Sequence, residues 1–65
     1  MLLKGIISTI NKQENTAEII LPEYDNAITG ELPFYKRSAV GEEVGDFVIV
    51  ALFNGGNDLN DGAIL

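Results

Sequence analysis

The hydrophobic residues of this 65-residue chain fall into five short stretches separated by polar segments that carry glycine or proline. Residues 2–10 are rich in leucine and isoleucine, and the polar NKQEN of residues 11–15 follows. Residues 16–21 alternate apolar and polar positions and stop at Pro22, a pattern typical of a half-buried strand. These two stretches predict a hairpin with a five-residue loop, in which Gly5 indicates a bend or a bulge.

The second half of the chain predicts three more strands. Residues 28–35 form a less regular stretch interrupted by Gly30 and Pro33, and because proline has no amide to donate, Pro33 belongs at the edge or end of a strand. Residues 36–46 are polar and end in Gly45-Asp46, a good turn directly before the apolar run FVIVALF of residues 47–53. Residues 54–61 are turn formers, and residues 62–65 predict a short last strand.

Five strands joined by loops predict an all-β domain spanning residues 1–65, a small barrel or a sandwich. A barrel would remove exposed strand edges. A domain of this size buries only about 60% of its unfolded surface, so a further source of stability is expected. The chain has no cysteine for disulfides, which leaves oligomerisation.

Both faces of the stretch 47–53 are apolar, because a strand points alternate side chains to opposite sides. One face fits a core, and the other would be an exposed apolar stripe of the kind that marks an interface. We expect a subunit contact made by one of the two sets, and we assign it to Val48, Val50 and Leu52. The alternatives are a contact made by Phe47, Ile49 and Phe53, or a second face covered by the chain's own loop, residues 36–46.

The net charge of −6, from ten acidic and four basic residues, argues against nucleic-acid binding, which needs clustered lysine and arginine. The only adjacent basic pair is Lys36-Arg37, which we interpret as part of a solvated loop. No apolar run approaches the roughly 20 residues of a membrane span, and the first ten residues make a poor signal peptide. We expect a soluble protein made in the cytoplasm.

The residue types indicate no catalytic, metal or cofactor site. Histidine and cysteine are absent, which removes the usual nucleophile and base sets and the commonest zinc ligands. The loop NGGNDLNDG does not fit an EF-hand, because Leu59 would occupy a ligand position, and its Gly-Gly pair lacks the helix start of a phosphate site. Two carboxylate pairs remain, which we interpret as solvated loops: Glu42 with Glu43, and Asp58 with Asp61.

Nearly the whole chain resembles one family in the order and spacing of its segments. The segments are KGII, then IILPEYDN, then VGDFVIVALF, and finally DGAIL. In these features the chain resembles the OB-fold barrel of phage baseplate hub and tail-spike proteins, also found near the start of type VI secretion tip proteins.

The resemblance implies an OB-like five-stranded barrel, with an SH3-like barrel as the alternative. It implies a non-enzymatic structural part of a phage or prophage tail or baseplate, arranged as a trimer or higher ring and contacting other tail proteins. Such a protein would leave the host cytoplasm in the virion tail. The β-helical needle of spike proteins has no counterpart here, so membrane puncture is not carried over. The alternative function is a small binding module that recognises a peptide or an oligosaccharide through its loops.

Overall fold

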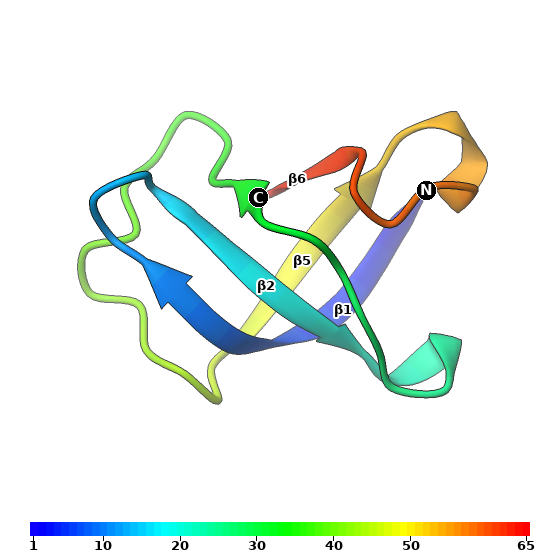
Figure 1. The fold of residues 1–65 in the computed structure, drawn as a ribbon, viewed down its shortest axis with the longest axis horizontal. Coiled ribbons are helices and arrows are strands. Elements are labelled where there is room, and N and C mark those ends of the chain that lie inside the picture. Colours follow the sequence, from blue (N-terminus) through cyan, green and yellow to red (C-terminus); the bar gives the residue numbers. More distant parts are fainter.

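Six β-strands and two short 3₁₀ turns make up the computed structural model, which describes residues 1–65 (Figure 1). In chain order these are β1 (Leu2–Asn11), β2 (Thr16–Leu21), η1 (Pro22–Tyr24), β3 (Ala27–Ile28), β4 (Leu32–Pro33), β5 (Phe47–Leu52), η2 (Asn54–Gly56) and β6 (Gly62–Ile64). The prediction of an all-β fold is confirmed.

The strands form one curled sheet in the order β3-β2-β1-β5-β6, with every neighbouring pair antiparallel. β4 pairs with the opposite end of β2 from β3. Phe34, just after β4, forms a parallel bridge to Ile64 in β6, and the Tyr35 amide donates to the Ile64 carbonyl at 2.7 Å. Figure 1 shows β6 lying beside this segment. The sheet therefore curls back on itself, as the predicted small β-barrel requires.

The β1–β2 hairpin is present, and of the two irregularities predicted at Gly5, a bend or a bulge, the bulge lies elsewhere. The register shifts between Ile7 and Thr9. Gly5 has a different role, because a Cβ atom there would clash with Cγ2 of Ile19 on β2. The absent side chain lets Ile19 fill the interior at this point of the curled sheet.

The third predicted strand, residues 28–35, is divided into β3 and β4. Thr29 lies between them and is buried, with its hydroxyl accepting from the Ile19 amide at 3.0 Å and its own amide donating to the Ile19 carbonyl at 2.9 Å. Gly30 follows, and a Cβ atom there would clash with Asn60. Pro33 is the last residue of β4, as predicted for a residue without an amide hydrogen.

Apart from the bridge at Phe34, the connection between β4 and β5 consists of bends, turns and irregular backbone. The predicted Gly45-Asp46 turn is confirmed. Two hydrogen bonds join it to Ile7 of β1: the Gly45 amide donates to the Ile7 carbonyl, and the Ile7 amide donates to the Asp46 carbonyl. β5 begins directly after it and ends at Leu52, so Phe53 lies outside the strand.

The core lies inside the curl. It is built from the inward positions of β1, β2, β4, β5 and β6 together with two residues of the connection between β4 and β5. Its twelve members are Leu3, Ile7, Ala17, Ile19, Leu21, Leu32, Phe34, Ala39, Val48, Val50, Leu52 and Ile64. No buried side-chain nitrogen or oxygen lacks a hydrogen-bond partner.

Candidate functional site

The two faces of β5 differ sharply in exposure. Val48, Val50 and Leu52 point into the core, with exposed fractions of 6%, 0% and 1%. Our assignment of these three residues to a subunit contact is therefore wrong, because the chain's own interior already covers them. The physical reason is the register with β1, whose inward residues Leu3 and Ile7 pack in the same cluster.

The alternative set, Phe47, Ile49 and Phe53, is the exposed one, at 66%, 44% and 51%. Residues 36–46 leave these side chains exposed. The alternative that this loop covers the second apolar face of β5 is therefore excluded. The same loop exposes two valines of its own, Val40 and Val44. The second apolar face of β5 is therefore an open surface of the chain.

This surface continues across neighbouring strands, because outward residues pair in register. Ile6 of β1 lies opposite Phe47 on one side and opposite Ile20 of β2 on the other, and Ile20 lies opposite Ile28 of β3. One row of four large apolar residues thus runs over four strands. Phe47 and Ile28 at its ends are exposed, and the two isoleucines between them are half-buried.

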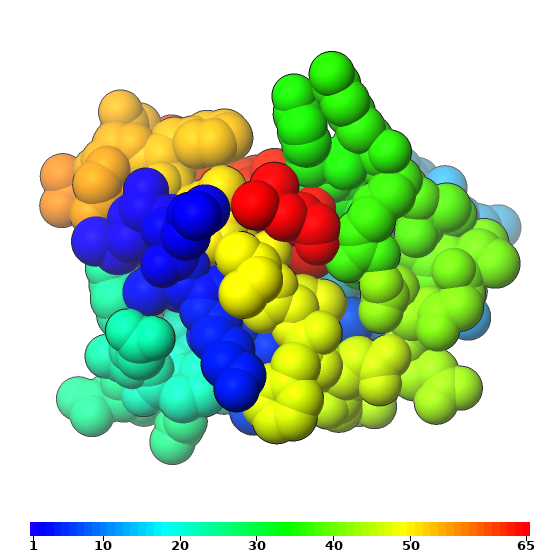
Figure 2. Space-filling view, turned by 180° about the vertical axis from the view of Figure 1, so that it is seen from behind, coloured from blue at the N-terminus to red at the C-terminus, as the bar shows by residue number.

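Two more rows lie beside this one on β1 and β5. Lys4 pairs with Ile49, whose carbonyl accepts from the Leu65 amide, and Leu2 pairs with Ala51. We call the surface formed by all three rows the outer face. Its part on β1 and β5 is the basic end, which comprises Leu2, Lys4, Phe47, Ile49 and Leu65. Figure 2 shows β1, β5 and the last residues side by side on this side of the molecule.

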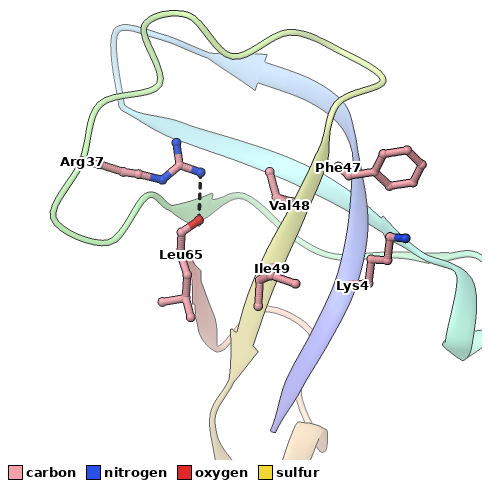
Figure 3. Close-up of a pocket in the computed structure, with 6 residues that line it drawn as sticks. All are labelled: Lys4, Arg37, Phe47, Val48, Ile49 and Leu65. Atoms are coloured by element: carbon pink, nitrogen blue, oxygen red, sulfur yellow. Dashed lines mark hydrogen bonds between the residues drawn. The ribbon is translucent and has the colours of Figure 1, made fainter.

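A shallow hollow of about 360 Å³ lies within the basic end. Its lining residues come from β1, β5 and the two segments flanking them in space: Lys4, Arg37, Phe47, Val48, Ile49 and Leu65. Figure 3 shows Arg37 on one side of the hollow, donating to the Leu65 carbonyl at 2.8 Å, with Lys4 and Phe47 on the other. The lining contains two cationic side chains and no acidic side chain.

The two cations differ in their partners. Arg37 forms an ion pair with Glu42, the only ion pair in the structure. Lys4 has no carboxylate partner, and its Nζ lies 4.7 Å from the centroid of the Phe47 ring. A cation over an aromatic face is attracted by the ring quadrupole, so Lys4 and Phe47 form one cationic and aromatic unit.

The four carboxylates considered above lie in the loops, and three of them bond to neighbouring groups. Glu42 pairs with Arg37, Asp58 accepts from the Asn60 amide at 2.9 Å, and Asp61 accepts from the Asn54 side chain at 2.7 Å. No group of three or more acidic residues is placed to hold a metal ion. The outer face is thus the surface feature of the molecule that most needs explanation.

Comparison with protein-family models, curated proteins and solved structures found no match to this chain. No helix in the structure has the length and apolar character needed to cross a membrane.

Proposed function

We propose that this chain is a non-enzymatic structural component of a phage or prophage tail or baseplate that works by assembling with copies of itself and with other tail proteins. The observation that carries the proposal is the outer face. Apolar residues scattered singly are ordinary on a protein surface, whereas a contiguous patch marks an interface. Phe47, Ile6, Ile20 and Ile28 form such a patch over four strands.

The size of the chain supports self-assembly. The core cluster has only twelve residues, and burying a valine, leucine or phenylalanine side chain contributes about 1.5 to 3 kcal/mol. Covering Phe47 and Ile49 in each copy would supply a substantial fraction of the folding free energy that a domain of this size lacks.

The assignment to a tail or baseplate rests on the resemblance of the segments IILPEYDN, VGDFVIVALF and DGAIL to the barrel of hub and spike proteins. Genes for tail or baseplate proteins on both sides of the gene would support this assignment, and a different neighbourhood would remove it.

The test of self-assembly is sedimentation of the unmodified protein over a range of concentrations, combined with thermal melting. Assembly stabilises the folded chain by mass action, so the melting temperature should rise with protein concentration. Ile49→Ser should abolish that rise, and Val40→Ser, which changes an exposed valine outside the outer face, should retain it. A monomer at high micromolar concentration, with a melting temperature independent of dilution, would refute self-assembly.

A second candidate function is a binding module for a peptide or an oligosaccharide. The hollow beside Phe47 favours it, because its volume of about 360 Å³ is at the lower end of ligand sites, which run from about 300 to 1,000 Å³. This function would become the leading one if the protein is monomeric and its gene lies outside a tail cluster.

A further inference from the structure

We infer that copies of this chain associate head to tail, with the basic end of one copy covering a second, acidic part of the outer face on the next copy. This inference rests on the self-assembly proposed above and specifies which surfaces meet. We call the second part the acidic end, comprising Glu18 and Ile20 of β2, Ile28 of β3 and Glu31. The two ends are different surfaces, so the contact is heterologous and leads to a ring if the rotation closes.

The acidic end has the apolar centre that a partner for Phe47 and Ile49 needs. Ile20 and Ile28 lie directly opposite each other on β2 and β3, and Ile28 is 56% exposed. Figure 1 shows β2 on the near side and β5 on the far side of the curled sheet. The outward sides of β2 and β5 therefore face in different directions (Figure 1). Head-to-tail assembly requires that a different copy cover each of them at the same time.

The charges of the two ends are complementary. Two carboxylates, Glu18 and Glu31, lie on one side of the pair of Ile20 and Ile28, toward the Thr16 end of β2. Glu18 accepts a hydrogen bond from the Thr9 hydroxyl at 2.7 Å, and Glu31 accepts one from the Thr16 hydroxyl at 3.2 Å. Neither carboxylate forms an ion pair within the chain, and neither does Lys4 at the basic end. A head-to-tail contact would bring Lys4 of one copy close to Glu18 and Glu31 of the next copy.

A symmetric contact between two basic ends would bring like charges together. In a two-fold contact the same patch lies on both sides of the interface. It would bring two copies of Lys4 to an apolar surface whose hollow is lined by no acidic side chain, and burying an unpaired charge is costly. The charge distribution therefore favours the acidic end as the partner surface.

Mixing two blocked variants tests this arrangement. Phe47→Asp blocks the basic end and Ile28→Asp blocks the acidic end, and both residues are exposed, so both variants should keep the circular dichroism spectrum of the unmodified protein. Each variant alone should sediment as a single chain. An equal mixture should form a complex of two chains and nothing larger, because one intact contact remains. Val40→Asp is the control and should assemble like the unmodified protein.

Charge reversal provides an independent test on the same surfaces. Lys4→Glu and Glu18→Lys should each raise the concentration needed for assembly about tenfold or more, and the two changes together in one chain should recover most of that loss.

The outcomes separate the two proposals. An unmodified protein that stays monomeric would overturn self-assembly and this inference together. If the unmodified protein assembles, then an Ile28→Asp variant that assembles equally well, or an equal mixture that forms no complex of two chains, overturns the head-to-tail contact and leaves self-assembly standing.

Discussion

The inward and outward sides of β5 carry side chains of the same chemical kind in opposite surroundings. Val48, Val50 and Leu52 are almost completely buried, whereas Phe47 and Ile49 keep about half or more of their surface in contact with solvent. Hydrophobicity alone therefore does not distinguish a core position from a contact position on this strand. The distinction comes from β1, which places Leu3 and Ile7 on the inner side and Lys4 and Ile6 on the outer side.

The largest effect should come from placing a charge on each side of β5. Val50→Asp should abolish folding, because an unpaired carboxylate would sit at a fully buried position. Phe47→Asp, on the same strand, should leave the fold intact, because the side chain is 66% exposed. Circular dichroism and the dispersion of amide signals in NMR spectra check the pair. A folded Val50→Asp protein would mean that the inner side is not the core.

Truncation should give a smaller contrast between the same two sides. Leu52→Ala should destabilise the folded chain by about 2 to 5 kcal/mol, through lost burial and a residual cavity. Ile49→Ala should cost less than about 1 kcal/mol in dilute solution, and more as the protein concentration rises and the outer face becomes covered. Urea denaturation at two protein concentrations measures both. Equal costs for Ile49→Ala at both concentrations would contradict an outer face that is buried by assembly.

A third prediction concerns the hydroxyl that joins β2 to the segment between β3 and β4, whose loss should cost less than the loss of the Leu52 side chain. Thr29→Val should cost about 1 to 3 kcal/mol, because the Ile19 amide would lose its acceptor in a buried position. Thr29→Ser keeps the hydroxyl and should recover most of the loss, so it is the matched control. Denaturant unfolding below the assembly concentration provides the measurement. A serine variant as unstable as the valine variant would mean that the methyl group contributes as much stability as the hydrogen bond.

The fold class could be predicted from local patterns. Alternation in residues 16–21 and the turn formers Gly45 and Asp46 place two strands and a turn where the structure has them. The division of the third strand could not be predicted in this way. It depends on Thr29 bonding to Ile19 and on the approach of Gly30 to Asn60, both of which are contacts between distant parts of the chain.

The orientation of β5 was also beyond local patterns, because both of its faces are apolar. One available signal was overlooked. Residues 2–6 alternate so that Lys4 shares a side with Leu2 and Ile6, and a lysine normally marks the solvent side. This would have identified the outer side of β1, but choosing the matching side of β5 still requires the register between the two strands, in which Ile6 lies opposite Phe47.

The central place of β1 has a consequence for the time course of folding. β2 follows β1 directly and can pair with it as a local hairpin, whereas β5 comes from the last third of the sequence. Pairs between distant segments form slowly, because the intervening chain must first lose its freedom. Until β5 arrives, one edge of β1 and its isoleucines stay open to other molecules, and such edges invite aggregation. Refolding yield should therefore fall as the concentration of unfolded chains rises, and rapid dilution should recover it.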